Sequence, residues 1–279
     1  MAQSLPVSRN KTGFESPTSR YAVKAVDKAL RILETIGKDS VELNLIELSR
    51  HLHIEKSTLH RLLGTLEGRG FIRKDPASLR YSLGIKMLEL GTAVTARSAL
   101  GRTAAPVLDR LAVRCRHTVN LAILDRDEVL YVARRDSPEP LRLTVDVGRR
   151  IPAHCTALGK AMLAFRPVAE VRRLFSRRRR LPRFTPNTIA SPRDLLAQLE
   201  AVRRTGVALD REELTLGIRC LAAPVLDLTE FACAAISITA PSATLNEERV
   251  AELRPVLLEA VREVSKALGG PSIPPRLRG

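Results

Sequence analysis

The stretch from Arg50 to Asp75, RHLHIEKSTLHRLLGTLEGRGFIRKD, constrains the fold more than any other part of the chain. Its leucines at positions 59, 62, 63 and 66 recur at i, i+3, i+4 and i+7, which predicts that they share one buried face of a helix. The opposite face lacks Asp and Glu, and it presents small, hydroxylated and basic residues around a glycine: Ser57, Thr58, His60, Arg61, Gly64 and Thr65. A face of this composition indicates a helix that meets a partner.

The sequence around this helix predicts a winged helix-turn-helix over residues 21–84. A shorter helix, LIELSRHL, follows the cap residue Asn44, and only HIE separates the two helices. After Gly70, FIRKDPASLRYSLG is typical of two short strands around a turn, which would form a two-stranded wing. A first helix over residues 21–37 has an expected apolar stripe of Val23, Val26, Ala29, Leu30 and Leu33.

Charge and composition narrow the class of partner. The formal net charge is +16, which attracts nucleic acid or an anionic membrane surface. No apolar run reaches the ~18 residues of a membrane helix, so we expect no membrane partner. Aromatic residues make up only 3% of the chain and Trp is absent, whereas single-strand binders stack bases on aromatic side chains. Duplex DNA is therefore the favoured partner.

On this interpretation, the leucine-faced helix presents its N-terminal turns to the major groove. Ser57 and Thr58 can donate to phosphates or bases, and Arg61 can reach guanine O6 and N7. Gly64 removes side-chain bulk where the helix backbone comes near the DNA. The candidate DNA-binding residues on helix and wing are Lys56, Ser57, Thr58, His60, Arg61, Gly64, Thr65, Arg73, Lys74 and Arg80. A solvated face of a protein-interaction domain is the alternative, which the wing and the charge disfavour.

The rest of the chain predicts a connector and a second domain. Residues 85–116 are expected to be a helical linker, with Pro106 in the first turn of its second helix and a surface that could pack on a twin connector. Residues 117–268 mix strands with helices, as in an α+β sensor-type domain. The expected strands are TVNLAIL, EVLYVARR, LRLTV, CLAAPVL and CAAISIT. Residues 1–20 are expected to be a disordered arm, and residues 269–279 a loose tail.

The four cysteines, Cys115, Cys155, Cys220 and Cys233, have no CxxC spacing. Their scatter disfavours a zinc ribbon or a redox motif and favours reduced thiols in the cytoplasm. The first twenty residues also lack the apolar core of a secretory signal. We therefore expect a cytoplasmic protein without metal or cofactor.

Three motifs, in order along residues 22–268, resemble the IclR family of bacterial transcription regulators. They are AVDKALRILETI with IELSRHLHIEKSTLHRLLGTLEGRGFIRKD and RYSLGIKMLELG; VGRRIPAHCTALGKAMLAF; and GVALDREELTLGIRCLAAPVLD with AAISITAP. The resemblance implies an α+β protein with an N-terminal winged helix-turn-helix, a linker helix and a C-terminal GAF-like effector-binding domain. It also implies homodimers, or homotetramers built as dimers of dimers, on palindromic double-stranded operators.

The resemblance places the effector-binding site at Leu143, Ala157, Leu158, Asp210, Ile218, Cys220, Ser237 and Thr239. Helix N–H groups at Ala157 and Leu158 would attract an anion, and residues two apart on a strand, such as Ser237 and Thr239, face the same way. These groups suit a small organic acid as effector. Asp210 would repel an acid unless it bonds a ligand hydroxyl or caps a loop. Ordinary core packing is the alternative.

An enzyme and a DNA-binding protein without a sensor are the two alternative classes of function. Catalysis is disfavoured because His154 and Cys155, expected on a strand, would point apart, and because Gly159-Lys160 lacks the other residues of a P-loop. A chromosome-organising DNA-binding protein without a sensor would need no ligand pocket, so ligand-dependent footprinting would separate it from a regulator. The sequence departs from the family at Glu230, where a turn glycine is common, and in the cluster Arg177–Arg180. Effector, operator, and repression or activation stay open.

Overall fold

The structure is a computed structural model that describes residues 23–38, 42–97, 99–137, 146–175 and 180–271. The chain divides between Thr95 and Ala96 into two compact units. Several expectations lie outside the described residues: the arm at 1–20, the strand at 141–145 with Leu143, Arg177–Arg179, and most of the tail.

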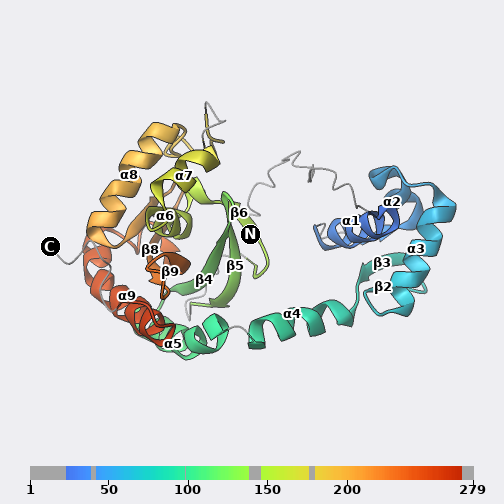
Figure 1. The fold of residues 1–279 in the computed structure, drawn as a ribbon, viewed down its shortest axis with the longest axis horizontal. Coiled ribbons are helices and arrows are strands. Elements are labelled where there is room, and N and C mark those ends of the chain that lie inside the picture. The colour runs from blue at the N-terminus through green and yellow to red at the C-terminus, as the bar shows by residue number, and fades with distance from the viewer. Residues whose placement is uncertain (1–22, 39–41, 98, 138–145, 176–179, 272–279) are drawn as a thin grey trace. The chain divides into compact units, whose positions relative to one another are not determined.

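The N-terminal unit is the expected winged helix-turn-helix (Figure 1). Its elements are α1 (Lys24–Lys38), β1 (Leu43–Asn44), α2 (Leu45–Leu52), α3 (Lys56–Gly68), β2 (Ile72–Lys74), β3 (Arg80–Leu83) and α4 (Ile85–Arg97). The wing was expected to have two strands, but β1 pairs with β3 through Leu43 and Tyr81 and makes the sheet order β1-β3-β2. A strand of two residues is too short to produce the alternating pattern by which strands are predicted from sequence.

The stripe expected on α1 is wrong for Val23, Val26 and Leu30, whereas Leu33 packs on the core as expected. Val23, Val26 and Leu30 are more than half exposed, whereas Ile32 and Ile36 are buried against α2 and α3. Two apolar faces are available on this helix, and only packing against α2 and α3 decided which one is buried. The leucine face of α3 is confirmed, because Leu59 and Leu63 are buried and Leu62 and Leu66 pack on them.

The start of α2 confirms the predicted cap at Asn44. Its Oδ1 accepts from the N–H groups of Ile46 and Glu47 at 2.9 and 3.0 Å. The Glu47 carboxylate accepts in return from the Asn44 N–H at 2.9 Å, which completes a capping box. The cap fixes where α2 begins, and therefore how α2 and α3 are connected.

The C-terminal unit is a sheet with helices on both faces (Figure 1). Its six strands have the order β6-β5-β4-β9-β8-β7, and every pairing is antiparallel. The elements are α5 (Ala99–Cys115), β4 (Thr118–Asp125), β5 (Glu128–Arg135), β6 (Arg150–Pro152), the 3-10 helix η1 (Ala153–Cys155), α6 (Ala157–Ala164), α7 (Val168–Phe175), α8 (Pro192–Thr205), β7 (Ala208–Arg211), β8 (Ile218–Leu226), β9 (Ala232–Pro241) and α9 (Glu247–Ala267). The short strands β6 and β7 were not predicted.

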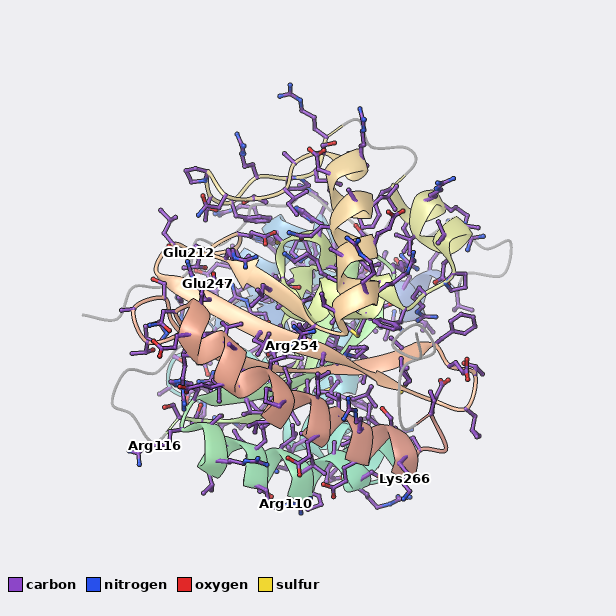
Figure 2. The ribbon with its side chains drawn as sticks, turned by 90° about the vertical axis from the view of Figure 1, so that its left-hand side faces the viewer. Arg110, Arg116, Glu212, Glu247, Arg254 and Lys266 are labelled. Atoms are coloured by element: carbon purple, nitrogen blue, oxygen red, sulfur yellow. The ribbon has the colours of Figure 1, made fainter. Side chains whose placement is uncertain are left out.

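Helices α5 and α9 cover one face of this sheet (Figure 2). They are joined by ion pairs at 2.6 Å from Arg110 to Glu263 and from Arg114 to Glu259. Helix α5 therefore packs within the C-terminal unit, although the sequence suggested a connector through residue 116. Pro106 lies inside α5 rather than in its first turn, which corrects the expected helix start.

The beginning of α9 is attached to the edge of the sheet. Figure 2 shows Glu212 and Glu247 near one another, and Arg219 on β8 contacts the two carboxylates at 3.9 and 3.3 Å. Asn246 caps the helix by accepting from the Arg249 N–H at 2.8 Å. These contacts hold the start of α9 against β8, the strand that carries the predicted effector residues Ile218 and Cys220.

The segment SPRDLLAQLEAVRRTG begins with a cap residue and ends with a glycine, a pattern that predicts a helix over these residues. Ser191 caps α8, and Gly206 ends it with a φ of 73°. Glu230, in the hairpin between β8 and β9, has a φ of 63°, the left-handed region that favours glycine. The Asp227 carboxylate supports this turn by accepting from the Thr229 N–H at 2.8 Å. The hairpin thus holds a residue other than glycine in the left-handed region.

Helix α6 covers the other face of the sheet and is seated by a close backbone contact. A Cβ atom at Gly159 would lie 2.1 Å from the Ala153 carbonyl oxygen, so only glycine lets η1 approach α6 this closely. Thr156 caps α6 by accepting from the Gly159 N–H at 3.0 Å. Within the described ranges, none of the helices combines the length and the apolar composition of a membrane span.

Replacing Gly159 by Ala should destabilise the C-terminal unit, because the added methyl must displace the backbone of Ala153. Overpacking of this kind costs about 1–3 kcal/mol, measurable as a lower urea midpoint in denaturation. Gly64→Ala is the matched control, since no atom lies within 4 Å of its Cβ position. Equal midpoints for wild type and Gly159→Ala would contradict this account of η1 and α6.

Candidate DNA-binding face and effector site

The outward face of α3 is exposed and rich in polar groups. Ser57, His60, Arg61, Gly64 and Thr65 are exposed, as is Lys56, whereas Thr58 is half-buried. Among the described residues, the side chains of Lys56, His60 and Arg61 have no hydrogen-bond or ion-pair partner. These cationic and polar groups are free to meet an anionic partner, as expected from the leucine spacing on the opposite face.

Glu55, which the sequence reading did not single out, caps the start of α3. Its carboxylate accepts from the N–H groups of Ser57 and Thr58 at 3.0 and 3.2 Å and from the Ser57 hydroxyl. Hydrogen bonds from the Ser57 side chain and from the Ser57 and Thr58 N–H groups lower the pKa of Glu55 to about 2. Ser57 can therefore donate to DNA only if it leaves Glu55. The sequence signal was a Glu directly before the helix, outside the usual set of caps.

The three basic residues of the wing have different surroundings. Arg73 on β2 is exposed. Lys74 lies over the Tyr81 ring, with its Nζ 5.7 Å from the ring centroid. Arg80 is half-buried and binds the Glu42 carbonyl and, at 3.2 Å, the Glu47 carboxylate. Arg80 thus fastens the wing to α2, while Arg73 remains the more accessible charge.

The candidate effector residues on the strands share one face of the sheet. In β9, Ile236 and Ile238 point toward α5 and α9, so Ser237 and Thr239 point toward α6. Register places Thr239 opposite Cys220, and Cys220 opposite Asp210, in a row across β9, β8 and β7. Ile218 lies on the same face, two residues before Cys220.

These strand residues are joined by a hydrogen-bond chain that includes Asn120 of β4. The Asn120 Nδ2 donates to Ser237 Oγ at 3.4 Å and to Thr239 Oγ1 at 3.2 Å. The Thr239 hydroxyl donates to Cys220 Sγ at 3.2 Å. Ser237 and Asp210 are buried, whereas Thr239 and Cys220 are half-buried, so the site is closed but nearest to solvent at the Thr239 end.

The first turn of α6 adds backbone donors to this layer. Ala157 and Leu158 are buried, and neither N–H donates to an acceptor among the described residues. Helix α6 contacts β4, β7, β8 and β9, which carry the polar rows. The sequence-predicted residues described here therefore lie in one layer between α6 and the sheet.

A buried ion pair forms the side of this layer next to β7. Lys160 of α6 is fully buried and binds the carboxylate of Glu213, which is also buried. The Glu213 N–H donates to Asp210 Oδ1 at 2.7 Å. Neither Lys160 nor Glu213 was predicted as a site residue. Their motifs, GKA and DREEL, gave no sign that the two charges meet.

Burial governs the ionisation of the titratable groups beside this ion pair. It raises the pKa of Asp210 to about 7, although the Glu213 N–H and the Lys160 ammonium oppose the shift. Burial also raises the pKa of the Cys155 and Cys220 thiols. Burial therefore favours the neutral form of Asp210, which would repel an acid less than an ionised carboxylate would.

His154 and Cys155 were expected on a strand, but both lie in the 3-10 helix η1. His154 Nε2 is 2.9 Å from the Pro182 carbonyl, and Cys155 Sγ contacts the Pro152 carbonyl at 3.4 Å. Both side chains serve packing and local hydrogen bonding. The described residues bring together no group of three or more His, Cys, Asp or Glu side chains suited to a metal ion.

Comparison with known proteins agrees with this architecture. The model of the IclR helix-turn-helix domain matches residues 25–76, and that of the bacterial transcriptional regulator IclR C-terminal domain matches residues 92–266. The HTH-type transcriptional regulator BhcR of Paracoccus denitrificans (strain Pd 1222) is 35% identical over 257 residues, 92% of this chain and 91% of that protein.

Solved structures with the same fold include two regulators of this kind. The crystal structure of an IclR transcriptional regulator from Alicyclobacillus acidocaldarius has a TM-score of 0.81 and 28% identity, covering 89% of this chain and all of that one. An IclR homolog from Microbacterium hydrocarbonoxydans, complexed with 4-hydroxybenzoate, has a TM-score of 0.77 and 25% identity, covering 88% and 99%. These matches name regulators of transcription rather than enzymes. The protein belongs to the IclR family of bacterial transcriptional regulators, with a DNA-binding helix-turn-helix domain and a C-terminal effector domain.

Proposed function

We propose that the protein binds a palindromic operator through α3 and the wing, as a dimer or a dimer of dimers, and that a small organic acid switches this binding. The observation that carries the proposal is the outward face of α3, where Lys56, His60 and Arg61 are exposed and unpaired around Gly64. The charges of Lys56 and Arg61 attract phosphates, and the Arg61 guanidinium can bind guanine O6 and N7. A regulator of this kind acts in the cytoplasm, where the bacterial chromosome lies.

Gly64 supports direct contact between α3 and DNA. Glycine within a helix costs about 0.8–1.0 kcal/mol relative to alanine, and no neighbouring atom requires it here. The fold alone would therefore be more stable with alanine. A close approach of the helix backbone to a groove wall accounts for the glycine.

The layer between α6 and the sheet supports an acid as effector. Ser237 supplies a hydroxyl, and Ala157 and Leu158 supply N–H groups without an acceptor among the described residues. Donors at a helix start favour a carboxylate. The 4-hydroxybenzoate in the complex of the Microbacterium homolog is also an organic acid, which supports this choice for the present chain.

Helix α4 supports self-association. Ile85 is 67% exposed, Leu88 64% and Leu90 48%, so the helix carries apolar side chains that the N-terminal unit does not bury. The same apolar side chains on α4 of a second copy of the chain would cover this surface. Two winged helices related by a two-fold axis would then read the two halves of a palindrome.

Gly64→Ala should raise the free energy of unfolding by up to ~1 kcal/mol and still weaken binding to DNA selected from a random-sequence pool. Urea denaturation and gel shifts on the same preparations measure both effects. Gly68→Ala, one turn further along α3 and also in open space, should keep the affinity. Unchanged affinity in Gly64→Ala would refute close backbone contact at this position.

Full-length protein at micromolar concentration should sediment with at least the mass of a dimer, and removal of residues 1–20 should not change this. Leu88→Glu should shift the mass toward the monomer, because it places a charge on the apolar surface of α4. Val113→Glu, at a residue 80% exposed on α5, is the matched control. A monomeric wild type would refute the assembly.

A panel of small carboxylic acids should contain at least one that raises the melting temperature and changes operator affinity by roughly 5- to 150-fold. Ser237→Leu should abolish both responses while basal operator binding stays near normal, because Ser237 lies in the C-terminal unit. Thermal shift and gel shift are measured together. A full ligand response in Ser237→Leu would show that the effector binds elsewhere.

A further inference from the structure

Asn120 is a buried polar residue at the effector layer that neither the motifs nor the chemistry of the sequence singled out. It lies on β4, it is 4% exposed, and register places it directly opposite Ser237 of β9. Its neighbours Val119 and Leu121 point toward α5 and α9, so the Asn120 side chain points toward α6. It therefore shares the face that holds Ser237, Thr239, Cys220 and Asp210.

The Asn120 amide sets the direction of the hydrogen bonds in this layer. Its Nδ2 donates to the hydroxyl oxygens of Ser237 and Thr239, at 3.4 and 3.2 Å. The hydroxyl hydrogens of these two residues must then point elsewhere, and that of Thr239 goes to Cys220 Sγ. Ser237 is left to donate its hydrogen, which is what a carboxylate acceptor requires.

The remaining atom of the amide has no partner. Asn120 Oδ1 is buried and receives no hydrogen bond from the described residues. A buried acceptor without a donor is unfavourable because it has lost its water without compensation. The same is true of Glu213 Oε2, next to the Lys160 ion pair. The layer thus has two buried acceptors that a ligand can satisfy only by donating.

We propose that Asn120 determines the specificity of the effector site, and that the effector is an organic anion that also carries a hydroxyl group. Its carboxylate accepts from the Ser237 hydroxyl and the N–H groups of Ala157 and Leu158. Its hydroxyl donates to Asn120 Oδ1. This inference rests on the proposed effector site and adds the chemical class of its ligand. A carboxylic acid without a hydroxyl would leave Oδ1 buried and unpaired, which is how a polar site discriminates between close analogues.

The test compares acids that share a carbon skeleton and differ in a hydroxyl. The probes are propionate with lactate, 3-hydroxypropionate and glycerate, and benzoate with 4-hydroxybenzoate. Dissociation constants are measured on the full chain by calorimetry, with thermal shift as a screen. In at least one set, a hydroxy acid should bind roughly 10-fold tighter or more than its parent acid, because only the hydroxy acid satisfies Oδ1.

Variants at Asn120 test whether the difference in affinity between parent and hydroxy acids depends on Asn120 Oδ1. Asn120→Leu removes the acceptor, so the ratio of dissociation constants between parent and hydroxy acid should fall to about one. Asn120→Asp keeps an acceptor and adds a negative charge, so both affinities should fall while the hydroxy acid remains the better ligand. Asn187→Leu, at an exposed amide in a turn between α7 and α8, should keep the wild-type ratio. If Asn120→Leu fails to fold, the wild-type ratio and Asn120→Asp still decide.

The outcomes separate this inference from the proposed function. Equal binding of parent and hydroxy acids by the wild type, or an unchanged ratio in Asn120→Leu, overturns the role of Asn120. If the wild type binds both kinds of acid equally and Ser237→Leu binds neither, the effector site is supported and only the role of Asn120 is wrong. If no acid binds, or if Ser237→Leu keeps full binding, the effector site is wrong and the inference falls with it.

Discussion

The buried ion pair between Lys160 and Glu213 is the contact on which the C-terminal unit depends. An ammonium can be fully buried only with a close partner, because removing it from water is otherwise prohibitive. Glu213 is itself held in place, since its carbonyl oxygen accepts from the Thr188 hydroxyl at 2.6 Å. One pair of charges therefore ties α6, the end of β7 and the loop around Thr188 together. The first turn of α6, with its free N–H groups, is oriented by the same pair.

The two proposed binding surfaces differ in burial. On α3, Lys56 and Arg61 are exposed and unpaired, so an attraction of these residues to DNA would be long-ranged and sensitive to salt. Between α6 and the sheet, Ser237 and Asn120 are buried, so each hydrogen bond to the proposed ligand would be strong and each missing one costly. A ligand bound in such a layer can alter DNA affinity only if it binds two arrangements of the protein unequally.

Local signals in the sequence were sufficient for elements whose stability is set by near neighbours. The leucine spacing predicted the buried face of α3, and Asn44 and Ser191 predicted helix starts, because a cap or a helical face involves residues a few positions apart. The failures share one cause. Val23 was expected to be buried and is exposed, and Pro106 was expected to begin a helix but lies inside one that starts at Ala99. In both cases packing against distant elements decided the outcome.

The sequence by itself determined the family, the longer helices and strands in their order, and most of the residues proposed here to bind DNA or an effector. Only the tertiary structure decided which of these groups meet and which are already engaged. Asn120 is 117 residues from Ser237, and Lys160 is 53 from Glu213, yet strand register and helix packing bring each pair into contact. The reason is that backbone geometry fixes patterns over a few residues, whereas contacts between distant residues follow from burying the two faces of one sheet.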